Sequence, residues 1–582
     1  MVVGRLGGLA RSVSMVGVFA CFTAACGSKD ANGGATAPPA PEPMTAASLP
    51  VGGSATLDVD SRVSLTGGST GGEFVLVVAD TAVDGSSAST AFQISASGIT
   101  SAGAVSPPSA SVSPLPGAGS PSAPRLDFNF AARLNERARP QLAAQVVGAR
   151  RAWDTAPSSD GRFSPSRSAA PLQIGDLITL NVSSRACDSV VNRVSRVVAI
   201  GSQSIVVADT LNPSGGFSTV DYQKFAARFD TLVYPLDVSN FGAPAVFGAD
   251  GKILLFFTTA VNELTPKGST SFVGGFFFGR DLFPIASTPD QAGCAGSNLS
   301  NLFYLLTPDP TGTVNGNVRR TGFVDSVTTA VLAQEFQHLI NASRRIFVNK
   351  SAQAFEAVWL NEGLSHIAEE LLFYHEGASA PQQNLDVNAL RASVRLKDAF
   401  NADQSSNAAR YRKYLVAPSV NSPILNNDSL ATRGATWDFL RYAADRKTRG
   451  GGSDASVWFA LVNSPTNSIA NLRQVFGANI GAMLRDWSVS NYTDDVVTGV
   501  SQDFTQPSWN WHSVFPALGS AGAAYPLSVA GLASTGASGS AIPGGASYYR
   551  FSVAANATAS LSLTTGAGAA PAIVQGVVVR LR

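Results

Sequence analysis

Charged residues and long apolar runs are scarce in this chain of 582 residues, and each scarcity excludes a class of function. Charged residues make up 14% of the chain, and the formal net charge is +1. No extended basic stretch occurs, which argues against nucleic acid as a main partner. No stretch is long and apolar enough to cross a membrane. The length exceeds that of a single hydrophobic core and predicts about two to four domains.

The N-terminus has the features of a targeting segment. Arg5 and Arg11 precede a short apolar run from Met15 to Phe22, which falls short of a membrane span. The sequence Thr23-Ala24-Ala25-Cys26 then resembles a bacterial lipoprotein processing site, which implies that Cys26 becomes the lipidated first residue of the mature protein. The alternative is an ordinary cleaved signal peptide. We therefore expect an exported lipoprotein of the cell envelope, at the outer membrane or cell surface and attached only through its lipid anchor, or else a secreted protein.

Cysteine is rare, with four residues in the whole chain. If Cys21 is removed and Cys26 carries lipid, only Cys187 and Cys294 remain. Neither belongs to a Cys-x-x-Cys pair, so we do not expect them to bind zinc. In an oxidising compartment they can form one disulfide, and two buried thiols are the alternative, because the sequence does not supply the distance between them.

Changes in composition mark the domain boundaries. Glycine, proline, serine and alanine are abundant, which suits a secreted, loop-rich protein with flexible linkers. Short alternating runs separated by Gly and Ser clusters occur near both ends, as in small β-sandwiches. We divide the chain into a signal peptide (1–26), a tether (27–50), a small β-sandwich (51–105), a Pro/Ser linker (106–125), a β-rich region (126–322), a helical region (323–515) and a C-terminal β-sandwich-like domain (516–582).

The two central regions differ in their periodicity. In the first, 253–257 is a fully apolar run typical of a strand buried on both faces. The apolar run 272–278 is broken by glycines and is either an edge strand, where a peptide can add, or plain core packing. The other predicted strands are 174–182, 197–200 and 205–207. The predicted helices are 127–153, 326–343, 355–374, 387–400, 432–446, 457–462 and 469–491.

Two of these helices carry the residues of a zinc hydrolase site. Positions i and i+4 share one face of a helix, so Gln334 and His338 point the same way and Glu335 lies one position round. Zinc lowers the pKa of a bound water, and a carboxylate then takes the proton. Catalytic zinc usually has three protein ligands. His338 suits a ligand, Glu335 the general base, and Glu362 on the next helix a further ligand.

The sequence Ala-Gln-Glu-Phe-Gln-His-Leu-Ile-Asn at 333–341, followed by Trp-Leu-Asn-Glu-Gly-Leu-Ser-His from Trp359, resembles a gluzincin peptidase. It is most similar to the hyicolysin-type secreted bacterial metallopeptidases, to which 258–266 and 439–445 are also similar. The resemblance spans about residues 187–492. It implies an α+β zincin-type core, with a β-rich N-terminal and a helical C-terminal subdomain, flanked by the small β-sandwich domains. It also implies zinc-dependent hydrolysis of protein or peptide substrates.

Carried over by position, the resemblance makes Glu335 the general base and His338 and Glu362 zinc ligands. Gln334 stands where the family has its other histidine ligand, and an amide oxygen is a poor zinc donor beside imidazole. His366, four residues after Glu362 on the same helical face, is a possible substitute ligand. The alternatives are that it donates a hydrogen bond to Gln334 or Glu335, or that it is a core histidine.

A peptidase also needs a donor that stabilises the oxyanion, and the sequence does not select one. The available donors are Tyr374, His375, Tyr411, Tyr414, Tyr442 and His512. Three functions remain open: an exported zinc metallopeptidase, a catalytically inactive pseudopeptidase that binds peptide or a surface partner, and a structural or adhesive lipoprotein. Gln334 motivates the second directly, and the order of Glu335, His338 and Glu362 argues against the third.

Overall fold

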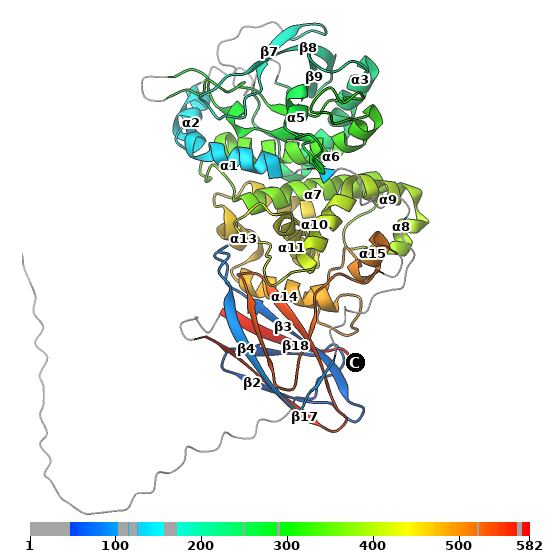
Figure 1. Cartoon of the computed structure of the whole chain (residues 1–582). Coiled ribbons are helices and arrows are strands. Elements are labelled where there is room, and N and C mark those ends of the chain that lie inside the picture. Colours follow the sequence, from blue (N-terminus) through cyan, green and yellow to red (C-terminus); the bar gives the residue numbers. More distant parts are fainter. Residues whose placement is uncertain are drawn as a thin grey trace, which may run out of the picture. The chain divides into compact units, whose positions relative to one another are not determined.

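The computed structural model describes residues 47–102, 115, 125–126, 129–155, 171–247, 251–287, 292–520, 523–566 and 573–582. These residues form a mixed α+β fold, as the sequence predicts (Figure 1). The predicted signal peptide, Cys26, nearly all of the tether and most of the Pro/Ser linker lie outside the described residues. Among the residues described, no helix combines the length and apolar character needed to cross a membrane.

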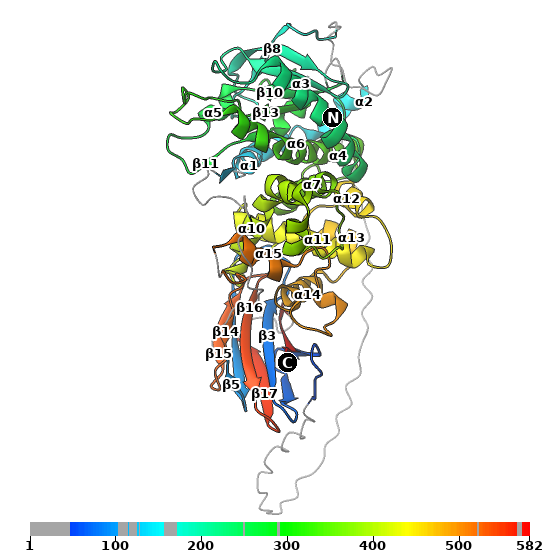
Figure 2. The same ribbon diagram turned by 90° about the vertical axis from the view of Figure 1, so that its right-hand side faces the viewer.

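Strands from both ends of the chain form two sheets that share an apolar core (Figures 1 and 2). One sheet has the order β1–β18–β3–β16–β14, with β5 also paired to β16, and the other has the order β15–β4–β17–β2. The strands are β1 (Ser54–Asp58), β2 (Arg62–Thr66), β3 (Gly72–Asp80), β4 (Thr90–Ser97), β5 (Thr100–Ser101), β14 (Ala530–Gly531), β15 (Ala537–Ala541), β16 (Ala546–Val553), β17 (Thr558–Thr565) and β18 (Val574–Arg580).

This arrangement differs from the predicted pair of sandwiches at 51–105 and 516–582, because the two segments interleave in one sandwich. The N-terminal strand β3 pairs antiparallel with the C-terminal strands β16 and β18 along nearly its whole length. Leu76 belongs to the sandwich core, whereas its neighbour Val77 belongs to the core shared with the helices. Strands from one terminus alone would leave open edges and bare apolar faces, which pairing between the termini removes.

A third sheet, of mixed parallel and antiparallel strands, lies in the region predicted to be β-rich. Its order is β12–β13–β10–β9–β8–β7, so β12 is an edge strand, antiparallel to β13. Strand β10 pairs in parallel with β9 and β13 and is buried throughout, as its apolar run predicts. The strands are β7 (Leu177–Asn181), β8 (Asn192–Ile200), β9 (Ser204–Asp209), β10 (Ile253–Phe257), β12 (Gly275–Phe277) and β13 (Leu302–Leu305).

Two long helices follow this sheet. Helix α6 (Thr321–Ser343) contacts β12 and β13 on one side and α7 (Val358–Gly377) on another, so almost every residue from Thr328 onward is buried. This burial includes the polar residues at 334, 335, 337, 338 and 341. Helix α7 ends where Ala378 takes a left-handed conformation at φ 52°. Polar side chains inside such a buried helix need partners from other elements.

Most of the remaining helices follow α7 in the chain. Predicted helix 387–400 is divided at Ser393, whose side chain caps the second half, and predicted helix 469–491 is divided at Gly477, where φ is 107°. The other α-helices described are α3 (Thr219–Arg228), α4 (Tyr234–Phe241), α5 (Thr259–Glu263), α8 (Val387–Ala392), α9 (Val394–Ala399), α10 (Ser405–Leu415), α11 (Leu430–Thr448), α12 (Asp454–Val462), α13 (Ser468–Phe476), α14 (Ile480–Thr493) and α15 (Trp511–Leu518).

The predicted helix 127–153 forms two helices, α1 (Asn129–Ala143) and α2 (Val146–Thr155). Just before α1, the short strand β6 (Arg125–Leu126) pairs in parallel with β11 (Ser271–Phe272), which precedes β12. Helix α1 contacts β12 and α7. Arg150 fastens α2 by donating hydrogen bonds to the backbone oxygens of Arg345, Ile346 and Ala352.

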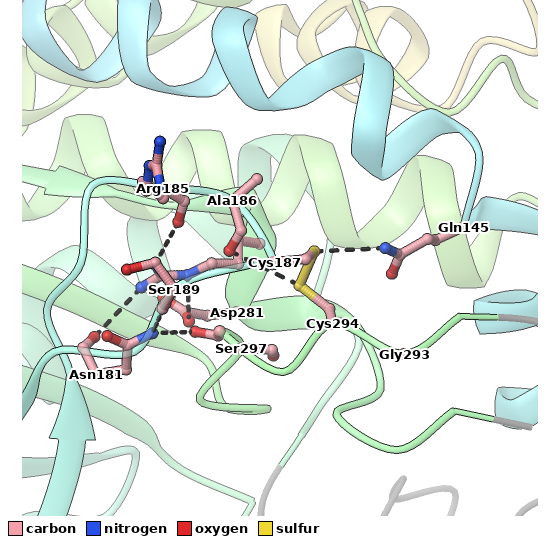
Figure 3. Close-up of a disulfide and its surroundings, with 12 residues drawn as sticks. Gln145, Asn181, Arg185, Ala186, Cys187, Ser189, Asp281, Gly293, Cys294 and Ser297 are labelled. Atoms are coloured by element: carbon pink, nitrogen blue, oxygen red, sulfur yellow. Dashed lines mark hydrogen bonds and ion pairs between the residues drawn. A yellow bond between two sulfur atoms is a disulfide. The ribbon is translucent and has the colours of Figure 1, made fainter.

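Cys187 and Cys294 are joined as a disulfide, with their Cα atoms 4.3 Å apart (Figure 3). The bond links two loops that are separated by 107 residues in the sequence. The side-chain amide of Gln145, between α1 and α2, lies 3.4 Å from the sulfur of Cys187. The backbone N–H of Gly296 donates to the carbonyl oxygen of Cys187, which further ties the two loops together.

Candidate functional site

The structure brings the predicted base and the two predicted ligands of α6 and α7 to one buried place. Glu335, His338 and Glu362 are each at most 6% exposed. The Nε2 atom of His338 lies 3.7 Å from Oε2 of Glu362. Gln334, one helical turn before His338, is buried as well. Helical periodicity on α6 and the close packing of α6 against α7 produce this grouping.

Arg433 of α11 is the cation nearest to Glu362 in this group. Its Nη1 atom lies 2.6 Å from Oε2 of Glu362, which is the distance of an ion pair. The geometry of this contact does not meet the angular requirement of a hydrogen bond. Its Nε atom donates to Oδ1 of Asp428 at 2.7 Å. The guanidinium is 1% exposed. A buried cation is therefore held between two carboxylates beside the predicted ligands.

Two glycines allow the helices to approach closely enough for this ion pair. A Cβ atom on Gly363, next to Glu362, would lie 2.4 Å from Cγ2 of Thr436 on α11. A Cβ atom on Gly434, next to Arg433, would lie 2.2 Å from the backbone of α10. Both distances are far below van der Waals contact, so only glycine fits at either position. The glycine of the Asn-Glu-Gly-Leu sequence thus helps to place Arg433 against Glu362.

Glu335 makes its hydrogen bond to the edge of the mixed sheet. Its Oε2 atom accepts from the backbone N–H of Phe277 in β12 at 2.8 Å. Burial raises the pKa of Glu335 well above its usual value, the Phe277 N–H opposes this effect, and the nearby charge of Glu362 adds to it. The predicted base is thus anchored to β12, and its protonated form is favoured.

His338 is a neutral imidazole in this surrounding. Burial lowers its pKa to about 4, and the positive charge of Arg433 contributes further. The side chain of Asn361, close to the ring, opposes this lowering of the pKa. Its nearest carboxylate is that of Glu362, which is already engaged by Arg433.

His366 is held in a separate buried cluster on α7. Its Nδ1 atom lies 3.0 Å from Oε2 of Glu369 and 3.3 Å from Nη1 of Arg410. Arg410 of α10 also pairs with Glu369 at 2.9 Å. Burial, with the charge of Arg410, lowers the pKa of His366 to about 3. Burial alone would raise the pKa of Glu369, but Arg410 and His366 together lower it.

A pocket opens beside His338 and Glu362. Its walls come from α1, the β12 edge, α6 and α7, and its floor includes both predicted ligands. Its polar lining residues are Asn135, Glu136, Arg139, His338, Asn341, Arg345, Glu356, Asn361 and Glu362. None of the donors predicted for the oxyanion lines this pocket. Of these donors, Tyr411 and Tyr442 instead bond to Asn491 and to the backbone of Asp503.

Sequence reasoning missed three residues of this site: Arg433, Asp428 and Asn135. Arg433 lies within the predicted helix 432–446, but it has no motif of its own. Its only local signal is Asp428, five residues earlier. Asn135 lies in a helix whose sequence carries no recognised motif. Arg433 and Asn135 reach the site through contacts between segments that are distant in the chain, and a single sequence does not show such contacts.

The residues present do not fit a three-ligand zinc site. Zinc would need three protein donors, and here an amide, Gln334, replaces one imidazole, while Arg433 occupies the carboxylate of Glu362. The Nδ1 atom of His366 contacts Glu369 and Arg410. Within the described ranges, no group of three or more His, Cys, Asp or Glu residues is placed to hold a metal ion.

Comparison with models of known protein families and with curated proteins finds no match to this sequence. The likeness to gluzincin peptidases therefore rests on the residues of α6, α7 and their neighbours, and it remains a prediction.

Proposed function

We propose that this protein is an exported pseudopeptidase: a gluzincin-like scaffold that binds extended peptide without hydrolysing it. The observation that carries the proposal is the buried ion pair between Arg433 and Glu362, beside an amide at the position of a ligand. The fixed positive charge stands next to the carboxylate that a zinc ion would need.

The charges argue against a dication at this place. The guanidinium of Arg433 already pairs with the carboxylates of Glu362 and Asp428. A zinc ion bound by His338 and Glu362 would lie beside the buried guanidinium, and like charges repel strongly in a medium of low dielectric constant. Arg433 would have to withdraw, which leaves Asp428 without its partner and costs several kcal/mol.

Peptide binding is supported by the pocket and by the strand that forms one of its walls. Strand β12 is the edge of its sheet, so its outward backbone groups are the ones to which a peptide strand would add. The pocket combines these groups with apolar wall residues and with acidic and basic side chains from α1, α6 and α7. This mixture suits a peptide backbone with varied side chains.

An active zinc metallopeptidase is the second candidate, and one observation favours it. His338 is buried and neutral, and its Nε2 atom lies 3.7 Å from Oε2 of Glu362. Glu335 and Glu362 lie near it, in the order that the family resemblance implies. This candidate requires Arg433 to leave Glu362 and a further ligand to replace the missing histidine.

Metal content and cleavage of casein separate the two candidates. We expect the purified wild type to contain no stoichiometric zinc and to leave casein uncut. Gln334→His alone should bind little more zinc than the wild type, because Arg433 remains paired with Glu362. Gln334→His combined with Arg433→Ala should bind about one zinc per chain, since three donors are then available.

The control for this experiment is Gln337→His combined with Arg433→Ala. It places the same new imidazole on the same buried helix but on a different face. Wild-type protein with one zinc per chain and casein cleavage blocked by a chelator would establish the metallopeptidase instead. Circular dichroism of each variant reports whether the fold is kept.

A further inference from the structure

Helix α1 lies along the outer edge of β12, where an added peptide strand would have to lie. The side chain of Asn135 donates a hydrogen bond to the carbonyl oxygen of Phe277 at 2.9 Å. The same side chain accepts a hydrogen bond from the backbone N–H of Gly279 at 2.9 Å. One amide group therefore contacts two backbone groups that lie two residues apart on the edge strand and the turn after it.

These contacts complete the hydrogen bonding of that part of the edge. Phe277 already donates its N–H to Glu335, so Asn135 and Glu335 together take both backbone groups of Phe277 and the N–H of Gly279. A peptide that adds to this edge needs the same groups. The carboxamide of Asn135 has the same donor and acceptor as a peptide bond, so it substitutes for a peptide bond of an added strand.

Other side chains of α1 fix the helix over the pocket. Arg139 donates to the carbonyl oxygen of Glu356 at 2.8 Å. The ring of Phe130 meets that of Phe276 in β12 with 5.2 Å between centroids. Glu136 lines the pocket together with Glu362. Helix α1 therefore covers the predicted ligand as well as the strand edge.

The attachment of α1 differs from that of α2. Helix α2 is held by the three backbone contacts of Arg150 and by Trp153, whose ring lies 5.2 Å from those of Phe247 and Phe347. Helix α1 ends near Pro140, which lacks an N–H for the helical ladder, and a two-residue turn at Ala144 and Gln145 joins the two helices. This turn separates α1, which carries Asn135, from the segment that Arg150 and Trp153 hold.

We propose that α1 is a built-in competitor for the peptide-binding edge of β12, and that a peptide binds only when α1 lifts and withdraws Asn135. The inference rests on the proposed function, because it assumes that this groove takes peptide. It adds that the groove is closed in the resting protein and that the competing group belongs to the chain itself. The apparent affinity for peptide is then the intrinsic affinity reduced by the fraction of open molecules.

Fluorescence anisotropy with fluorescein-labelled tryptic peptides of casein tests the competition in the full chain. Asn135→Ala removes two hydrogen bonds that hold α1 closed, so we expect the apparent affinity to rise about ten-fold. The matched control is Arg137→Ala, at an exposed position of the same helix, which should leave the affinity unchanged. Equal affinities of wild type and Asn135→Ala would overturn the inference.

Hydrogen exchange provides the second measurement. In the wild type, saturating peptide should accelerate amide exchange of residues 129–143 and leave that of residues 146–155 unchanged. Peptide that binds without loosening α1 refutes the competitor role but leaves the proposed function standing. If neither the wild type nor Asn135→Ala binds these peptides, the proposed function fails, and the competitor role fails with it.

Discussion

The guanidinium of Arg433 and the carboxylate of Glu362 form an ion pair between α11 and α7, with Nη1 and Oε2 2.6 Å apart. Both side chains are at most 3% exposed, so solvent screens this pair little. Breaking a buried pair by removing one partner leaves an uncompensated charge, whereas replacing both partners avoids that cost.

Replacing Arg433 alone therefore has a larger effect than replacing the pair. We expect Arg433→Met to lower the free energy of unfolding by about 3–5 kcal/mol. The double variant Glu362→Gln with Arg433→Met should lose less than the single variant, because no buried charge remains at position 362. Urea unfolding of the wild type, both single variants and the double variant gives the coupling energy. Strictly additive losses would contradict a buried ion pair.

Because Glu370 on α7 is a buried carboxyl, we expect the protein to lose stability as the pH rises above neutrality. Glu370 accepts a hydrogen bond from Nε1 of Trp509 at 3.1 Å. Burial raises its pKa to about 7, with Arg441 and Trp509 opposing. Between the unfolded and folded pKa values, the folded state binds more protons than the unfolded state. The stability that the protonated carboxyl of Glu370 contributes is therefore fully present below about pH 4.5 and is lost as the pH rises through 7.

Glu370→Gln removes this titration and keeps an acceptor for Trp509. Relative to the wild type, the variant should gain up to about 3 kcal/mol in unfolding free energy between about pH 4.5 and pH 8. Chemical denaturation at a series of pH values measures the difference. Asp325→Asn, at an exposed position on α6, is the control and should show no such trend. A difference that does not change with pH would refute the assignment.

The bond between Cys187 and Cys294 closes a long loop, because 107 positions separate the two residues. Removing it gives the unfolded chain more freedom, so Cys187→Ser with Cys294→Ser should lower the unfolding free energy by about 2–4 kcal/mol. Thermal unfolding with and without a reducing agent measures the effect. The reductant should destabilise the wild type and leave the double variant unaffected. If it affects neither protein, the two thiols are not bonded in solution.

The N-terminal sequence leads us to propose that the mature protein is attached to the membrane by a lipid on Cys26. Cys26→Ser should move the protein from the detergent-soluble membrane fraction to the soluble fraction, because the acyl chains are its only expected anchor. Cys21→Ser, within the same segment, is the control and should keep the lipid. The mass of the mature wild-type protein is the direct readout. A soluble wild type without added lipid mass would support an ordinary signal peptide.

The parts of the fold that local patterns specify were predicted with the most success. The apolar run 253–257 forms the buried strand β10. Helical spacing predicted α6, α7 and α11, and the majority of the predicted helix ends lie within a few residues of the observed ones. The predicted helix 469–491 differs from the structure because Gly477, with φ at 107°, divides it. These features depend on neighbours along the chain, which the sequence displays directly.

The interleaved sandwich depends on contacts between the two ends of the chain. Each terminal segment shows the alternation of β-strands, but neither segment shows which strands it will pair with. Pairing of β3 with β16 and β18 decides that the two segments form one sandwich. Register and partner choice follow from burial of both faces of β3, which only the assembled protein provides.

The sequence by itself selected the candidate site residues of α6 and α7, Gln334, Glu335, His338 and Glu362, from helical spacing, residue type and resemblance to a known family. The tertiary structure alone decided what surrounds them. It placed Arg433 on Glu362, His366 with Glu369 and Arg410, and Asn135 on the edge of β12. The physical reason is that periodicity acts within one helix, whereas charge balance and competition for a strand edge arise between elements far apart in the chain.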